Sequence, residues 1–135
     1  MKYSLITLLI FTSTTLHAQQ WKQVATDEQG IAYSFDWSTL RKEGNLTRIW
    51  ALENLPEKKP SMLLSDSTSV FSYRYRMEFD CKNERQKILS FSSFSEKDAG
   101  GKVISRNDFP APPADVPPGT VAWLLMKTAC KAKHR

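Results

Sequence analysis

Few residues in this sequence have the types and spacing that catalysis or metal binding needs. The chain contains two histidines, His17 and His134, and His134 lies next to the C-terminus, where a chain usually frays and cannot hold a catalytic triad rigidly. The patterns H-x-x-x-H and C-x-x-C and an acidic calcium loop do not occur. The sequence leaves open whether the fold brings two carboxylates together for acid-base chemistry, but no spacing suggests such a pair. The residues concerned are scattered over expected loops: Asp66, Glu96, Asp98, Asp108 and Asp115. The sequence therefore predicts a protein that is not an enzyme and that holds no metal or cofactor.

The two cysteines are a structural signal. Cys81 ends a strand pattern, and Cys130 lies near the end of a helical pattern. Two cysteines in an exported chain favour one disulfide, which the chain-entropy model values at about 4 kcal/mol for a loop of this size. The alternative is a pair of buried free thiols.

Positive charge provides the main candidate for binding. The formal net charge is +5, and basic residues gather along one strand and the turn after it: Arg74, Arg76, Lys82, Arg85 and Lys87. Such a patch would suit a sulfated glycan, lipopolysaccharide phosphate or an acidic protein segment. The alternative is a solvated sheet face, in which arginines pair with Glu78 or Glu84. Nucleic acid is disfavoured as a partner because the chain is expected to be exported.

Residues 1–18 have the composition of a signal peptide. Lys2 precedes an apolar run at 5–11, and a small, polar segment ends in L-H-A with Ala18 at the expected cleavage site. The run is shorter than the about 18 residues that a membrane span needs. The alternatives are an uncleaved anchor and a buried N-terminal strand.

The expected mature chain, residues 19–135, has the length of one domain. It has no second apolar segment for a membrane span, and neither cysteine lies at the cleavage site to take a lipid anchor. We expect an exported protein that is soluble in the periplasm or released, and surface display stays open.

Alternating apolar and polar residues predict six strands, and the alternation is clearest at residues 70–81. There, one face is apolar or aromatic and the other is charged, with Arg74 and Arg76 on the charged face. The apolar face consists of Phe71, Tyr73, Tyr75, Met77, Phe79 and Cys81. The expected strands are residues 21–26, 31–36, 46–55, 70–81, 87–95 and 102–106.

Four features of the connections follow from turn and proline chemistry. Asp36 could cap a single helical turn after the second strand. Residues 56–69, with two prolines and several serines, read as a surface loop. A bulge at Ser92-Ser93 would bring Phe94 into phase with the rest of its strand. Residues 109–119 carry five prolines and predict an extended crossover that forms no strand.

The crossover leads to a predicted helix at residues 121–131, with Thr120 as its N-cap. Its apolar stripe would face the sheet and consist of Val121, Leu124, Leu125, Thr128 and Ala129. Trp123 lies nearly opposite the centre of this stripe, so it is the candidate exposed contact residue, for example in a homodimer. Core packing is the simpler expectation for the other tryptophans, Trp21, Trp37 and Trp50. The fold class is therefore α+β, an antiparallel sheet of about six strands with a C-terminal helix packed on it and tethered by a disulfide.

The order of these landmarks resembles the surface-adhesin protein E-like domain of Gram-negative bacteria. The matching pieces are a first strand with Trp21, Y-S-F-D at 33–36, R-K-E-G-N at 41–45, a strand with Trp50, E-F-D-C at 78–81, I-L-S-F at 88–91, P-P-G-T at 117–120 and Cys130. The resemblance implies the same sheet and disulfide-tethered helix. It also implies adhesion, meaning that the domain binds host matrix and plasma glycoproteins from the cell surface. None of the matching pieces is an adhesive motif.

Two functions of different classes remain. The first is an exported binding module that recognises a host glycoprotein or a sulfated glycan through the charged sheet face. The second is a periplasmic envelope or structural protein that contacts other envelope proteins or lipopolysaccharide and has no host ligand.

Overall fold

The computed structural model describes residues 19–61 and 68–133. The predicted signal peptide and part of the predicted loop at 56–69 lie outside these ranges, as does His134. The elements are β1 (Trp21–Thr26), β2 (Ala32–Glu43), β3 (Leu46–Pro60), β4 (Ser69–Asp80), β5 (Arg85–Phe94), β6 (Val103–Asn107), β7 (Ala114–Asp115) and α1 (Val121–Lys131). In this part of the chain, no helix is long and apolar enough to span a membrane.

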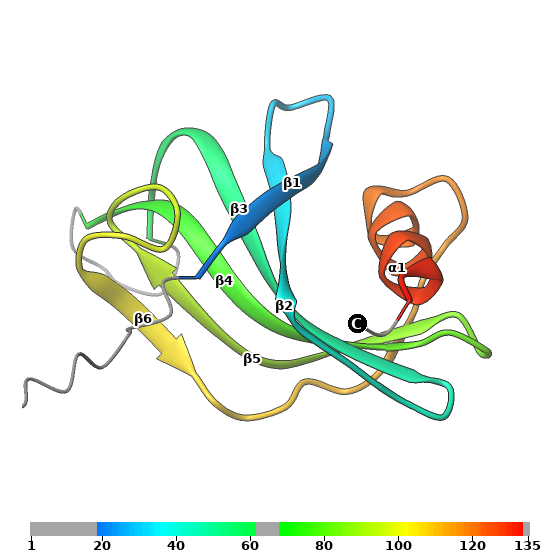
Figure 1. Cartoon of the computed structure of the whole chain (residues 1–135). Coiled ribbons are helices and arrows are strands. Elements are labelled where there is room, and N and C mark those ends of the chain that lie inside the picture. Colours follow the sequence, from blue (N-terminus) through cyan, green and yellow to red (C-terminus); the bar gives the residue numbers. More distant parts are fainter. Residues whose placement is uncertain (1–18, 62–67, 134–135) are drawn as a thin grey trace, which may run out of the picture.

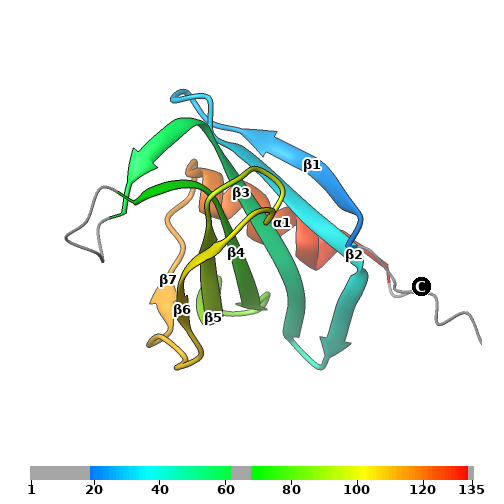
Figure 2. The same ribbon diagram turned by 90° about the vertical axis from the view of Figure 1, so that its left-hand side faces the viewer.

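The strands form one antiparallel sheet in chain order, β1-β2-β3-β4-β5-β6. Figure 1 shows this sheet curving beneath α1, and Figure 2 shows β7 beside the sheet at its β5 side. Every neighbouring pair in this order is consecutive in sequence, and short turns at 44–45 and 81–84 set the register of β2 with β3 and of β4 with β5. Gly44, for example, has φ +57° in the turn between β2 and β3, a conformation that favours glycine. The predicted α+β fold is confirmed.

The sheet has two chemically different faces, which the register of β3 with β4 defines. The helix face carries the pairs Thr47–Phe79, Ile49–Met77, Ala51–Tyr75 and Glu53–Tyr73. The outer face carries the pairs Arg48–Glu78, Trp50–Arg76, Leu52–Arg74 and Asn54–Ser72. The alternation expected for residues 70–81 therefore separates an apolar face from a charged one, as predicted.

The main core lies between the helix face and α1. Phe35, Ile49 and Phe79 are at most 1% exposed, and they pack with Met126 and Ala129 of α1. Burying a large apolar side chain contributes about 1.5–3 kcal/mol. This contact is therefore what holds an 11-residue helix, which would be marginal alone.

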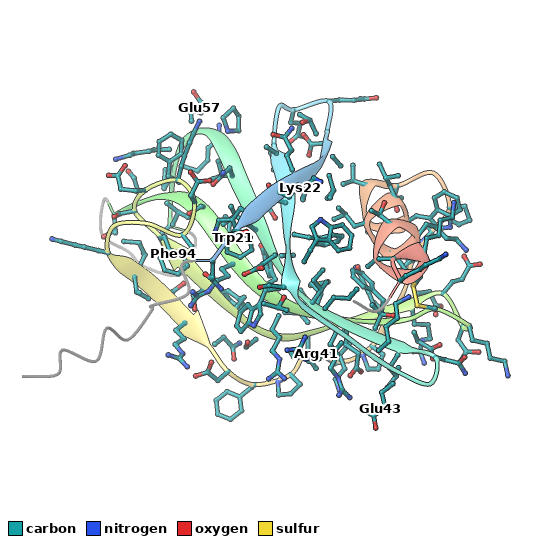
Figure 3. The ribbon with its side chains drawn as sticks, viewed as in Figure 1. Trp21, Lys22, Arg41, Glu43, Glu57 and Phe94 are labelled. Atoms are coloured by element: carbon teal, nitrogen blue, oxygen red, sulfur yellow. A yellow bond between two sulfur atoms is a disulfide. The ribbon has the colours of Figure 1, made fainter. Side chains whose placement is uncertain are left out.

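A second apolar cluster lies on the outer face at the end of the sheet away from α1, where Figure 3 shows Phe94. Leu52, Val70 and Phe94 are buried there. Ser72, also buried, donates its hydroxyl to Glu96 O at 2.5 Å and accepts from Ala99 N at 3.1 Å. These two hydrogen bonds join the turn between β5 and β6 to the start of β4. The prediction of a single buried face is wrong at the start of β4, because Val70 and Ser72 of the opposite face are also buried there.

The helix has the predicted bounds and the predicted cap, since the Thr120 hydroxyl accepts from Trp123 N at 3.1 Å. Its buried stripe is rotated from the prediction. Met126 and Ala129 are buried, whereas Leu124 is 46% exposed. The Thr128 hydroxyl donates to Leu124 O rather than facing the sheet. The expected exposure of Trp123 is wrong, because its ring packs against the core and its indole donates to Glu84.

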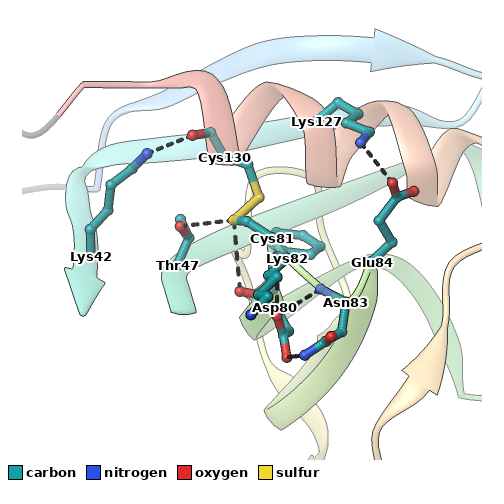
Figure 4. The surroundings of a disulfide bond; sticks show 10 residues. Lys42, Thr47, Asp80, Cys81, Lys82, Asn83, Glu84, Lys127 and Cys130 are labelled. Carbon is teal, nitrogen blue, oxygen red and sulfur yellow. Dashed lines mark hydrogen bonds and ion pairs between the residues drawn. A yellow bond between two sulfur atoms is a disulfide. The ribbon is translucent and has the colours of Figure 1, made fainter. Parts of the chain in front are cut away.

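The predicted disulfide is present, with Cys81 just after β4 and Cys130 in the last turn of α1 (Figure 4). The two Cα atoms are 5.8 Å apart. Lys42 donates to Cys130 O at 2.6 Å, and the Thr47 hydroxyl lies 3.3 Å from Cys81 Sγ. Both ends of the bridge therefore contact the first half of the sheet.

Two predicted connections are strand instead. No helical turn follows Asp36, because β2 continues to Glu43 with a large bulge between Asp36 and Arg41. The Asp36 carboxylate still caps the bend, since it accepts from Ser38 N and from the Ser38 hydroxyl. β3 also runs on to Pro60 through an irregular stretch between Asn54 and Lys59, so the predicted loop begins later.

Two further details of the last third of the chain differ. The pairing of β5 with β4 shifts between Ile88 and Ser90, not at Ser92-Ser93, which leaves Leu89 as the extra residue. The proline-rich crossover is not wholly free of strand, because Ala114 and Asp115 pair with the start of β5. These two residues lie between prolines and supply their own backbone hydrogen-bonding groups, so the proline argument did not apply to them.

Candidate binding face

Arg74 is the most constrained basic residue of the outer face. Its guanidinium carbon lies 5.2 Å from the ring centres of both Trp50 and Phe94. One terminal nitrogen donates to the Gln19 side chain at 3.2 Å, while the buried Nε has no hydrogen-bond partner among the residues that the structure describes. Burial, and next the charge of Arg106, lower the pKa of Arg74 from its ordinary value. The ring faces hold this cation in place without neutralising it.

Three other residues of the predicted patch share the outer face with Arg74. Arg76 lies two positions along β4, which is about 7 Å. On the neighbouring strand β5, Lys87 lies opposite Glu78 and Arg85 lies opposite Asp80 in the strand register. The structure thus brings four of the five predicted patch residues onto one face. The fifth, Lys82, is exposed in the turn between β4 and β5.

The carboxylates of this face already have donors. Glu78 accepts from Arg48 Nε at 2.7 Å. Asp80 accepts from the Asn83 side chain at 2.8 Å and from turn amides, and the side-chain bond is the main cause of its lowered pKa. The side chains that bond to these two acids, Arg48 and Asn83, therefore lie outside the predicted patch.

The alternative to a binding patch was a solvated face whose arginines pair with Glu78 or Glu84, and the structure agrees with it only in part. Glu84 pairs with Lys127 of α1 at 3.1 Å, and this bond is the main cause of its lowered pKa. Arg85 does have a partner, Asp115 at 3.2 Å. Within the described ranges, Arg76, Lys82 and Lys87 form no ion pair.

The tryptophans divide between the two faces. Trp50 lies between Asp36 and Arg76 in the sheet, and Trp21 pairs with Asp36 at the sheet edge, so both belong to the outer face. Trp37 packs edge-on against Phe35 at 5.3 Å in the main core. The sequence analysis did not predict the stacking of Arg74 on Trp50. The signal was that Trp50 and Leu52 share one face of β3, which puts an aromatic ring on the face that carries Arg74.

Among the residues that the structure describes, no group of three or more His, Cys, Asp or Glu could hold a metal ion. The outer face instead joins fixed cations to aromatic ring faces, which can bind anionic groups by charge and flat apolar groups by stacking. Together, fold and face define a small disulfide-bonded α+β domain with one sheet face packed and the other charged.

The comparisons place this domain in a family. The chain belongs to the surface-adhesin protein E family, whose model matches residues 21–131. Among solved structures, the selenomethionine form of Haemophilus influenzae protein E superposes with a TM-score of 0.61 at 11% identity, over 80% of this chain and 84% of that one. Crystal form II of the same protein gives 0.59 at 14% identity, over 73% and 79%. Identities this low show a shared fold. None of the curated proteins matches the chain significantly.

Proposed function

We propose that this chain is an exported, adhesin-like binding module that recognises an anionic partner through the outer face of its sheet. The partner class is a sulfated glycan or the anionic part of a host extracellular glycoprotein. Membership of the surface-adhesin protein E family supports an exported surface protein. The proposal includes removal of residues 1–18 and a mature domain of residues 19–135.

One observation carries the choice of an anionic partner. Glu78 and Asp80 of the outer face accept hydrogen bonds from other residues of the fold, while Arg76 and Lys87 form no ion pair among the described residues. A sulfate or carboxylate of a ligand would supply charge-assisted hydrogen bonds there. The stacked Arg74 adds a third cation that needs no ordering on binding.

The test compares two double charge reversals in binding to immobilised heparin, which serves as a sulfated-glycan probe. In Arg76→Glu/Lys87→Glu, two cations of the outer face become acids. We expect affinity to fall at least about tenfold, as electrostatic contacts are lost, and wild-type binding to weaken steeply with added salt. Arg74 is left unchanged, because its stacked side chain also supports the fold.

The matched control is Lys131→Glu/Lys133→Glu, which makes the same charge change at exposed positions at and beyond the C-terminal end of α1. Its affinity should stay close to that of the wild type, and thermal melts should show that both variants are folded. Equal losses in the two variants would mean attraction by net charge alone. Wild-type affinity in Arg76→Glu/Lys87→Glu would refute the outer face as the site.

A further inference from the structure

A hollow of about 240 Å³ lies on the helix face, beneath the first turns of α1. Its apolar wall comes from Phe35, Met77 and Ile88 of the sheet and from Ala122 and Leu125 of the helix. A cavity of about 150 Å³ with a similar lining is known to bind benzene. This hollow is therefore large enough for a short alkyl chain.

One end of the hollow is polar and acidic. Glu53 lies between Tyr33 of β2 and Tyr73 of β4 in the ladder, so a Tyr-Glu-Tyr row crosses three strands. Tyr75 lies two residues further along β4, where its hydroxyl opposes the rise in the pKa of Glu53, and its ring stacks on Tyr73 with ring centres 6.1 Å apart. Outside the lining of the hollow, the Asp27 carboxylate accepts from the Tyr33 hydroxyl at 3.1 Å.

The Glu53 carboxyl is partly buried and has no cation beside it. It forms no ion pair within the described ranges, although 19 of the 135 residues are Lys or Arg. Burial is the main cause of its raised pKa, and the charge of Asp27 adds to it. A buried charge normally has a partner, because leaving water is costly. The missing partner is a cation.

We propose that this hollow binds a primary alkylammonium group, as carried by a lysine side chain or a free amine. The alkyl stem would lie along the apolar wall, and the ammonium group would donate to the Glu53 carboxylate. The faces of the tyrosine rings are negative and attract a cation at close range. An ammonium group has three donors, which the Glu53 carboxylate and the tyrosine hydroxyl oxygens can accept.

The site is independent of the proposed outer-face function. Its charge is opposite, and its residues lie on the other side of β3 and β4. A free amine and a lysine side chain share the same chemistry, so the experiment must separate them.

The test measures binding of 1,5-diaminopentane and of Nα-acetyl-lysine methylamide to the mature chain by calorimetry. 1-Pentanol has the same stem without the charge and serves as the ligand control. We expect both amines to bind and pentanol to bind at least about tenfold more weakly. Binding of the lysine derivative alone would identify a lysine side chain as the occupant, and binding of diaminopentane alone would identify a free amine.

Glu53→Gln removes the charge but retains an acceptor for Tyr75, so the variant should fold and lose amine binding at least about tenfold. Glu28→Gln, at an exposed position in the β1–β2 turn, is the matched control and should bind like the wild type. The proposal is overturned if Glu53→Gln binds the amines as the wild type does, or if pentanol binds equally well. It is also overturned if the wild type binds neither amine at about 10 mM, a concentration that detects even millimolar affinity.

Discussion

Arg74 and Glu53 carry opposite charges on opposite faces of the same two paired strands. Each is partly buried, and among the described residues each lacks part of the bonding that a buried charge normally has: Arg74 Nε has no hydrogen-bond partner, and Glu53 forms no ion pair. The rings of Trp50 and Phe94 hold Arg74, and Glu53 lies between Tyr33 and Tyr73 in the sheet. Charges that a fold holds but does not neutralise are candidates for contact with a ligand.

Glu53 predicts a specific dependence of stability on pH. Its folded pKa is raised above the ordinary 4.5, mainly by burial, so the native state holds the proton more strongly than the unfolded state does. The stabilising contribution of the protonated form is complete below about pH 4 and is lost as pH rises through the folded pKa. Glu53→Gln should therefore melt higher than the wild type at neutral pH, and the difference should vanish in acid.

Thermal melts across pH, with Glu28→Gln as the control, measure this effect. The control should show no comparable difference from the wild type, because Glu28 is exposed. A Glu53→Gln variant that melts lower than the wild type at neutral pH would show that the carboxylate stabilises the fold and has its partner within it.

At the scale of elements, α1 is fixed to the sheet by one short stripe and a few polar contacts. Met126 and Ala129 enter the core, Lys127 pairs with Glu84, and Cys130 is bonded to Cys81. The disulfide spans 49 residues of sequence, so the chain-entropy model gives it about 4 kcal/mol. That is a large part of the about 5–15 kcal/mol that stabilises a small domain.

Cys130→Ser should accordingly lower the Tm by more than about 10 °C. It should also expose α1 to limited proteolysis before the sheet is cut. The double variant Cys81→Ser/Cys130→Ser is the control, and it should melt like the single variant if the lost cross-link, not a free thiol, is responsible. An unchanged melt of the wild type under reducing conditions would contradict this account.

The elements that sequence could predict are those in which pattern and packing agree. β1, α1 and its Thr120 cap were predictable because alternation, helical spacing and capping each pointed to one structure. The extension of β3 to Pro60 was not, because proline and lysine are unusual in strands and only pairing with β4 keeps them extended. Trp123 was predicted on the exposed face of α1, because helical spacing alone could not show that Met126 would lie at the centre of the buried face.

The candidate sites were harder to predict than the fold. The basic patch was visible because its residues are close in sequence. The Glu53 row was not, because it joins three strands whose register only the folded sheet sets. The stacking of Arg74 could not be predicted for the same reason, since its two rings, Trp50 and Phe94, come from the strands on either side of β4.

At the scale of the molecule, the two faces of the sheet differ in what they contact: one packs against α1, and the other carries most of the predicted basic patch. The helix face forms the core and an acidic hollow, and the outer face carries Arg76 and Lys87, which form no ion pair among the described residues. The chain belongs to the surface-adhesin protein E family, and the function that we propose for it would place its partner outside the cell. The alternative function, an envelope protein of the periplasm, would use the same face on a partner inside the outer membrane.

Exposure of the chain on intact cells is the most direct test of the central claim, that this domain is a surface binding module. Cells that produce the full chain are treated with protease, and the chain is then detected beside a known periplasmic protein. The account predicts that the chain is degraded while the periplasmic control survives. If the chain is protected until the outer membrane is opened, surface adhesion is contradicted and the partner must be sought in the envelope.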